Sequence, residues 1–181
     1  MIDYDSIVAS LNTSMKPINE YIDIKKRKYN IKDNFAGLYV FWFNNIDGYI
    51  NKLKTELVIH GPDNIEQEII WNWNLNNKNI CLYVGKSTDI KKRIGLHLLL
   101  GTKKLYEDKT AKKIYKKNTS SQLRSGFEYL YLKENNVNIF EEMEKRLGLS
   151  IFEEKKFERR FYIEDYLVGK LLPWFNVDSE R

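Results

Sequence analysis

The chain has 181 residues, with 30 Lys and Arg against 25 Asp and Glu, a net charge of +5 and a single cysteine, Cys81. One cysteine excludes an intramolecular disulfide and a cysteine-rich zinc site, and no stretch approaches the ~18 apolar residues of a membrane span. The N-terminal segment lacks the basic start and apolar core of a secretion signal, so we expect a soluble, cytoplasmic protein. The length favours a single domain, residues 1–181, that buries about 70% of its unfolded surface.

The first predicted elements are an N-terminal helical arm and a buried strand. Isoleucine and leucine recur at helical intervals through residues 1–30, and Pro17 interrupts this arm. Residues 37–43, GLYVFWF, form a continuous aromatic and β-branched run behind a glycine. Such a run is typical of a strand buried on both faces.

The next segment, residues 44–78, is an insertion that predicts a β-hairpin. The stretches 56–64 (ELVIHGPDN) and 67–75 (QEIIWNWNL) have strand character, and residues 61–64 supply the turn. Trp71 and Trp73 alternate as in a strand, and they suit the core, a dimer surface or a wedge between bases.

A second buried strand and a basic helix follow the insertion. Residues 79–85, NICLYVG, predict the strand, and residues 88–101 predict a helix that Thr88 or Asp89 caps and Gly101 ends. The packed stripe of this helix consists of Ile90, Ile94 and Leu98.

The remainder of the chain has mainly helical character. In residues 102–157 the sequence is basic and irregular as far as 118, and then predicts short helices over 120–135 and 141–148. Residues 150–176 contain at least one long helix, which must end near Pro173.

Basic residues concentrate after the second strand. From Lys86 to Lys117 there are eleven Lys and Arg against three acids, whereas residues 134–165 carry nine acids against six bases. Such a block suits a surface that follows phosphates, because each neutralised phosphate releases condensed counterions. It is equally typical of a solvated helix face.

Arg93 and His97 are four residues apart on the predicted helix, so they project in nearly the same direction and can act on one ligand. The free N–H groups of the helix N-terminus suit a phosphate, and the planar guanidinium of arginine suits the same anion. Taken singly, Arg93 also fits a solvent-exposed arginine and His97 a partly buried histidine.

The last helix carries a carboxylate at an apolar position. On a helical wheel Glu164 falls within the stripe formed by Phe157, Phe161, Val168, Leu171 and Leu172. A buried carboxylate requires a cation, a metal or several donors. Asp165 lies at the edge of the stripe and is the alternative buried acid.

Short matches in a fixed order resemble the GIY-YIG nuclease family. GLY at 37–39 and YVG at 83–85 stand where that family has its two tripeptides, and Arg93 and His97 follow on the next helix. Glu164 and Asn176 match its late glutamate and asparagine. The resemblance covers residues 37–43, 79–100 and 158–176.

The resemblance implies an α+β fold with a small central antiparallel or mixed sheet flanked by helices. It also implies a metal-dependent endonuclease whose single divalent ion is Mg²⁺, with Mn²⁺ as a substitute. In this family's site Glu164 binds the metal, Arg93 stabilises the phosphate and Asn176 braces the site. Tyr39 and Tyr83 are the strand tyrosines.

The chemistry of phosphodiester hydrolysis agrees with these residues, because the site must deprotonate a water and offset charge on the phosphoryl oxygens. Either Tyr39 or His97 is the proton acceptor. Tyrosine has an ordinary pKa near 10 and requires help from Lys86, His97 or the metal. Lys86, just past the strand, is therefore also expected in the site.

One departure from compact family members is the distance between the tyrosines, since Tyr39 and Tyr83 are 44 positions apart. Larger insertions here are a feature of the restriction-enzyme branch, which favours a sequence-specific type II restriction endonuclease with a cognate methyltransferase. The Tyr39 assignment requires the two strands to pair despite the insertion.

Recognition of double-stranded DNA must come from this chain or a second subunit, because no separate DNA-binding domain is visible. Cutting both strands with one site per chain takes two chains or two visits, and a twofold dimer on a palindrome is the simplest hypothesis. The segment from 120 to 124 also fits an ordinary helix cap. The expected DNA contacts are Lys91, Lys92, Ser120, Ser121, Gln122 and Arg124.

Three alternatives stay open. One is a phage, mobile-element or repair nuclease of the same family with low sequence specificity. Another is a non-cleaving DNA-binding module. The third is the other large nuclease pattern, for which Pro62-Asp63 and Glu107-x-Lys109 are the matching residues.

Overall fold

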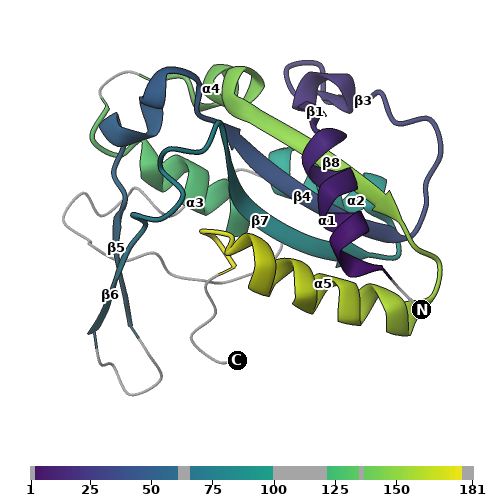
Figure 1. Cartoon of the computed structure of the whole chain (residues 1–181). Coiled ribbons are helices and arrows are strands. Elements are labelled where there is room, and N and C mark those ends of the chain that lie inside the picture. The colour runs from purple at the N-terminus through teal and green to yellow at the C-terminus, as the bar shows by residue number, and fades with distance from the viewer. Residues whose placement is uncertain (1–2, 61–65, 100–121, 135–136, 177–181) are drawn as a thin grey trace.

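A computed structural model describes residues 3–60, 66–99, 122–134 and 137–176 (Figure 1). Its main sheet has four strands, with every neighbouring pair antiparallel, in the order β1 (Lys16–Pro17), β8 (Leu147–Glu153), β4 (Gly37–Asn44) and β7 (Asn79–Ser87). The first seven residues of β4 are all buried, which confirms the strand predicted at 37–43. β7 confirms the strand predicted at 79–85 and continues for two further residues.

Helices cover both faces of this sheet (Figure 1). α1 (Tyr4–Thr13) and α5 (Phe157–Leu171) lie on one face, and α2 (Ile90–Leu99) and α3 (Gln122–Leu130) on the other. Alternate β4 side chains divide the core between them, since successive residues of a strand point to opposite faces. Leu38, Val40 and Trp42 pack with α1 and α5, whereas Tyr39, Phe41 and Phe43 pack with α2 and α3. The fold is therefore α+β with a small antiparallel sheet, as expected.

The insertion leaves the two tyrosine strands paired. It contains the 3₁₀ helix η2 (Ile46–Lys52) and the antiparallel strands β5 (Glu56–His60) and β6 (Glu66–Ile70), which confirm the predicted hairpin and project away from the main sheet (Figure 1). The second strand ends at Ile70, so the strand expected through residue 75 is wrong beyond that point, and Trp71 lies in the core at 1% exposed. β4 and β7 pair from Gly37 opposite Ser87 to Asn44 opposite Asn79, with one irregularity after Phe41. The insertion therefore does not reroute the strand that carries Tyr39.

The N-terminal arm is helical only as far as Thr13, so the helix expected over residues 1–30 is wrong beyond that point. The chain continues as β1, the short η1 (Ile18–Glu20) and a two-stranded ribbon of β2 (Ile22–Asp23) and β3 (Lys28–Tyr29). Pro17 has no N–H for a helix. Ile18 and Ile22 are fully buried, so the apolar spacing reflects burial in the core and not a helix face.

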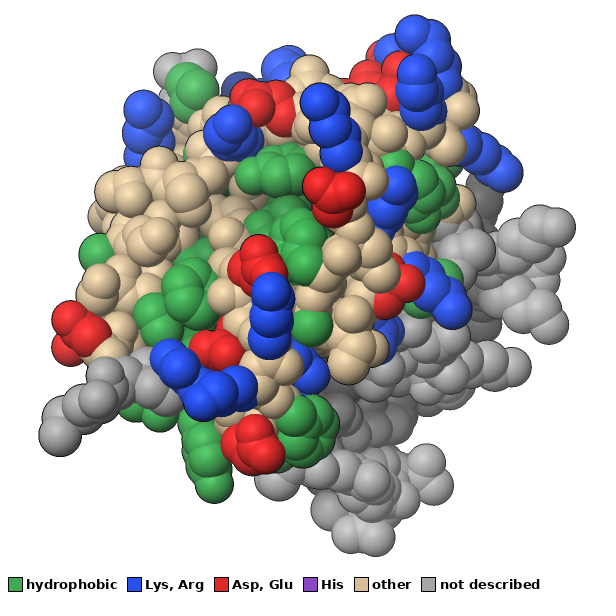
Figure 2. Space-filling model, turned by 90° about the vertical axis from the view of Figure 1, so that its right-hand side faces the viewer, with side chains coloured by type: hydrophobic (Ala, Val, Ile, Leu, Met, Phe, Trp, Pro, Cys, Tyr) green, Lys and Arg blue, Asp and Glu red, His purple; other side chains and the backbone are tan. Residues whose placement is uncertain are grey.

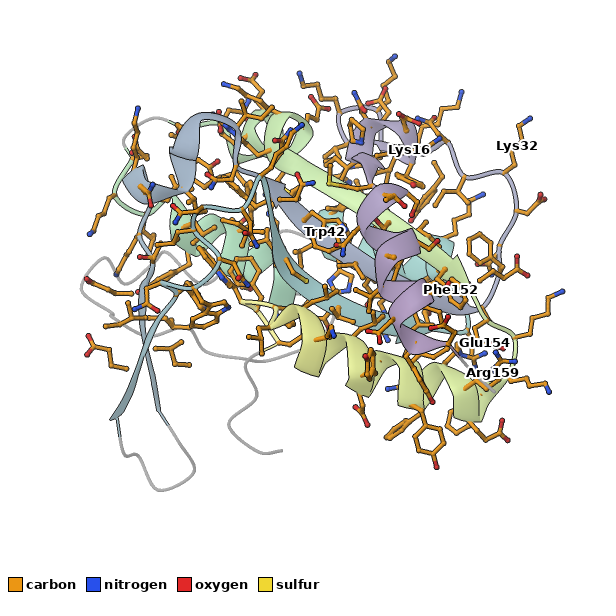
Figure 3. The ribbon with its side chains drawn as sticks, in the orientation of Figure 1. Lys16, Lys32, Trp42, Phe152, Glu154 and Arg159 are labelled. Carbon is orange, nitrogen blue, oxygen red and sulfur yellow. The ribbon has the colours of Figure 1, made fainter. Side chains whose placement is uncertain are left out.

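The region 102–157 needs a second correction, because it contains β8 as well as the predicted helices α3 and α4 (Ile139–Arg146). β8 pairs with β4 along its whole length. Ser150 lies in this strand, where its hydroxyl accepts a hydrogen bond from Trp42 Nε1 (3.0 Å) and donates one to the Leu11 carbonyl (2.6 Å). Figure 3 shows Trp42 and Phe152 on these two neighbouring strands. Glycine and serine interrupt the apolar run LGLSIFE, so the local sequence pattern did not predict this strand.

The start of α2 and the end of α5 agree with prediction, whereas the expected end of α2 at Gly101 lies outside the described residues. The Asp89 carboxylate accepts a hydrogen bond from the Lys92 N–H (2.7 Å), as a helix cap does, and Ile90, Ile94 and Leu98 are fully buried. α5 ends at Leu171, two residues before Pro173, with Leu172 in the left-handed region (φ 48°). Within the described ranges, no helix combines the length and apolar character that crossing a membrane requires.

Candidate active site

Tyr39, Tyr83 and His97 form a compact cluster on the α2 side of the sheet. Tyr39 Oη and His97 Nε2 share a hydrogen bond of 2.8 Å, although they are 58 residues apart in sequence. The Tyr83 ring lies 6.1 Å from the Tyr39 ring and 5.0 Å from the His97 ring, centroid to centroid. Gly85 lies opposite Tyr39 in the sheet, and a Cβ there would come within 2.3 Å of Tyr39 Oη. The glycine of the second tripeptide therefore makes room for the tyrosine of the first.

Burial keeps this cluster uncharged. Removal from water, and then the positive charge of Arg93, lower the pKa of His97 from 6.5 to about 3. Burial, followed by the proximity of Tyr83, raises the pKa of Tyr39 well above its ordinary value, and Arg93 partly opposes this rise. Near neutral pH both groups are neutral. His97 Nδ1 is buried and has no hydrogen-bond partner among the described residues.

Arg93 lies on α2, one turn before His97, and is partly exposed. Its positive charge helps to lower the pKa of His97 and opposes the rise in the pKa of Tyr39, so the guanidinium lies within electrostatic range of the cluster. The expected phosphate site at the start of this helix is not supported, because protein oxygens already accept the first N–H groups. The Phe35 carbonyl accepts from Ile90 N (3.1 Å), and the Asp89 carboxylate accepts from Lys92 N in the same first turn (2.7 Å).

Glu164 forms an ion pair with Lys86, which joins α5 to the end of β7. Glu164 is only 6% exposed, whereas its neighbour Asp165 is exposed, so Glu164 is the buried acid of the pair that the sequence left open. The Lys86 ammonium also lies 4.4 Å from the centre of the Phe161 ring. The negative charge of this carboxylate contributes to the raised pKa of Tyr39, after burial and the proximity of Tyr83.

The buried face of α5 differs from the predicted stripe. Phe157 and Phe161 are 65% and 46% exposed, and the face that packs on the sheet carries Arg160, Ile163, Glu164 and Leu167. Arg160 is buried because its guanidinium donates to the carbonyls of Glu154 and Lys155. Phe161 was not predicted as a site neighbour, although its position three residues before Glu164 puts it on the same side of the helix.

Asn176 binds the backbone of the second motif strand. Its side chain accepts from Val84 N and donates to Val84 O, each at 2.8 Å. Just before it, Trp174 N and Phe175 N donate to the carbonyls of Cys81 and Leu82. The segment after α5 is thereby fixed along β7, so the expected bracing contact exists.

The expected DNA contacts have different outcomes. Lys92 is exposed and Lys91 is partly exposed, with its ammonium 5.5 Å from the Tyr29 ring. Arg124 is only 4% exposed and is engaged by Glu128, the Leu98 carbonyl and Met143, so its assignment as a DNA contact is wrong. Ser120, Ser121 and the Gln122 side chain lie outside the described residues, as do Pro62-Asp63 and Glu107-x-Lys109.

The described surface includes a face of mixed charge. Figure 2 shows acidic and basic side chains interspersed there with hydrophobic ones. Near the start of α5, Glu154 and Arg159 form an ion pair at 3.0 Å (Figure 3). This face is therefore a poor match for a phosphate backbone.

The donor chemistry of the site fits a hard divalent ion. Mg²⁺ is commonly held by one or two carboxylates, with water and substrate phosphate oxygens as its other ligands. The described residues contain no cluster of three or more His, Cys, Asp or Glu side chains. Glu164 supplies one such carboxylate, and in this structure it is paired with the Lys86 ammonium.

Comparison of the chain with protein-family models, curated proteins and solved structures finds no match.

Proposed function

We propose that this chain is a metal-dependent endonuclease that hydrolyses DNA phosphodiester bonds through a site of the GIY-YIG type. The observation that carries the proposal is the convergence of motif residues from four separate segments. Tyr39 shares a hydrogen bond of 2.8 Å with His97 beside Tyr83, the charge of Glu164 contributes to the raised pKa of Tyr39, and Asn176 binds the Tyr83 strand. A sequence match by chance does not require these residues to lie in one region of the fold.

In this proposal the Tyr39–His97 pair accepts the proton of the attacking water. His97 is fully buried and Tyr39 is only 2% exposed, and His97 Nε2 contacts the Tyr39 hydroxyl. The proposal therefore requires the DNA complex to bring the attacking water to the Tyr39 hydroxyl, which accepts its proton while the tyrosine proton moves to Nε2, so no free phenolate forms. Neutral His97 has the free acceptor that this role requires, but a pKa of about 3 makes it a weak base, so the negative charge of the bound phosphate must raise that pKa for the transfer to occur.

The charged groups serve the phosphate in this scheme. Arg93 binds the nonbridging oxygens, where its planar guanidinium donates two parallel hydrogen bonds. Glu164 is the protein ligand for Mg²⁺, and the ion, when bound, offsets the negative charge that develops on the departing 3′ oxygen. The new P–O bond forms to the water oxygen as the bond to the 3′ oxygen breaks.

Sequence-specific restriction is the form of this activity that we favour. The insertion between the tripeptides is retained as a hairpin beside paired motif strands, as the resemblance to the restriction branch implies. With one site per chain, cutting both strands of double-stranded DNA takes two chains or two visits, of which a dimer is the simpler arrangement, and a cognate methyltransferase protects the host site. Base contacts are assigned to Lys91, Lys92 and the segment around residue 120.

The test is cleavage of unmethylated phage and plasmid DNA with and without Mg²⁺. The wild type is compared with Glu164→Gln, Arg93→Ala and the control Glu158→Gln, which changes an exposed acid on the same helix. We expect discrete fragments from the wild type and the control, and none from the other two variants or without metal. Circular dichroism verifies that each variant is folded.

Other results would redirect the proposal. A metal-dependent smear indicates a phage, mobile-element or repair nuclease with low specificity. DNA binding that is indifferent to both Mg²⁺ and Glu164, with no cleavage, supports the non-cleaving module. Cleavage by folded Glu164→Gln or Arg93→Ala removes that residue from the site.

A further inference from the structure

Lys86 takes the position beside Glu164 that a divalent ion needs. The two residues form an ion pair, in which the side chain of Lys86 is 27% exposed and that of Glu164 is 8% exposed. The ammonium is also held over the Phe161 ring at 4.4 Å. Both contacts come from α5, so the lysine at the end of β7 has a defined place in the protein without DNA.

The charge balance opposes metal binding in this state. The ion pair has no net charge, and a divalent ion that approaches Glu164 is repelled by the ammonium unless the lysine leaves. The described residues offer no cluster of three or more ligating side chains to compensate. Arg93, near the same tyrosines, adds further positive charge.

A DNA phosphate reverses this balance. Its oxygens give the flexible lysine a second anionic partner, and they supply ligands that the protein lacks for the ion. When the ammonium moves to the phosphate, the Glu164 carboxylate becomes available to the metal.

We propose that Lys86 is a positioning residue that keeps the divalent ion off Glu164 until a phosphodiester is bound, so that metal and DNA bind jointly. This inference rests on the proposed nuclease function. Because coupling between binding sites is reciprocal, the metal raises DNA affinity by the same factor as DNA raises metal affinity.

The test is a titration of the protein alone with Mn²⁺, in which electron paramagnetic resonance measures free Mn²⁺. The variants are Lys86→Met, Lys86→Gln and Lys86→Arg, with the double variant Lys86→Gln/Glu164→Gln as the control for binding elsewhere. We expect weak binding by the wild type and Lys86→Arg, and at least about tenfold tighter binding by Lys86→Met and Lys86→Gln. The double variant loses this gain.

Two variants without the charge protect the test against a folding defect. Lys86→Met leaves Glu164 without its counter-ion, whereas Lys86→Gln keeps a hydrogen-bond donor beside the carboxylate. Equal Mn²⁺ affinity in the wild type and folded Lys86→Gln overturns the inference. So does a gain that survives Glu164→Gln.

The outcome is independent of the cleavage assay. If the wild type cuts DNA but Lys86→Gln binds Mn²⁺ no better, the blocking role fails and the nuclease proposal stands. If no DNA is cut but the gain at Glu164 is present, the nuclease proposal fails and the competition between lysine and metal remains.

Discussion

Acidification should destabilise this protein through His97. Its pKa is about 3 in the folded state and 6.5 when exposed, so the unfolded chain binds a proton in this range that the native state does not. The contribution of neutral His97 to the free energy of unfolding is complete above pH 6.5 and is lost as the pH falls toward 3. From about pH 7 to about pH 5, some 1.5 units at about 1.4 kcal/mol each give a loss of about 2 kcal/mol.

The assay is urea unfolding at both pH values for the wild type and His97→Gln, followed by tryptophan fluorescence. Glutamine is neutral throughout and can still bond to Tyr39, so this variant should lack the His97 contribution. Carboxylates and the other histidine titrate in both proteins, and their effects cancel in the difference. A pH dependence that is the same in both proteins would refute the burial of a neutral His97.

Two further substitutions test the packing of the site by thermal unfolding. Gly85→Ala should lower the free energy of unfolding by about 1–3 kcal/mol, because the added Cβ would lie 2.3 Å from Tyr39 Oη. The control is Gly169→Ala on α5, where an added Cβ meets nothing within 4 Å, so this variant should be neutral or stabilising. Equal losses of stability at both positions would contradict the close approach of Gly85 to Tyr39. Asn176→Ala should lower the free energy of unfolding by about 2 kcal/mol, because Val84 N and O lose their side-chain partner. An unchanged melting temperature would show that this contact does not stabilise the protein.

Local pattern was a good guide where burial is continuous along the chain. The run GLYVFWF has no polar residue, so a strand buried on both faces was the natural prediction, and β4 lies at the centre of the sheet. On α2 the cap at Asp89 and the stripe of Ile90, Ile94 and Leu98 are set by neighbours within one or two turns. Such features depend on short-range spacing, which a sequence displays directly.

Pattern misled where a residue's environment comes from distant segments. Arg124 resembles a surface residue at a helix start, yet Glu128, the Leu98 carbonyl and Met143 satisfy it in the interior. Phe157 and Phe161 resemble core residues, yet both are exposed. Arg160 lies between them in sequence and is buried, and its guanidinium donates to two carbonyls just before its own helix. For both arginines, hydrogen bonds offset the cost of burying a charged side chain.

The candidate site divides in the same way. The sequence by itself determined the order of the motif residues, the strands of Tyr39 and Tyr83, and the shared direction of Arg93 and His97. Only the tertiary structure decided that β4 and β7 pair across the insertion, that Glu164 and not Asp165 is buried, and that Lys86 is its partner. The physical reason is separation: Lys86 and Glu164 are 78 residues apart, and only the packing of α5 on β7 brings their charges together.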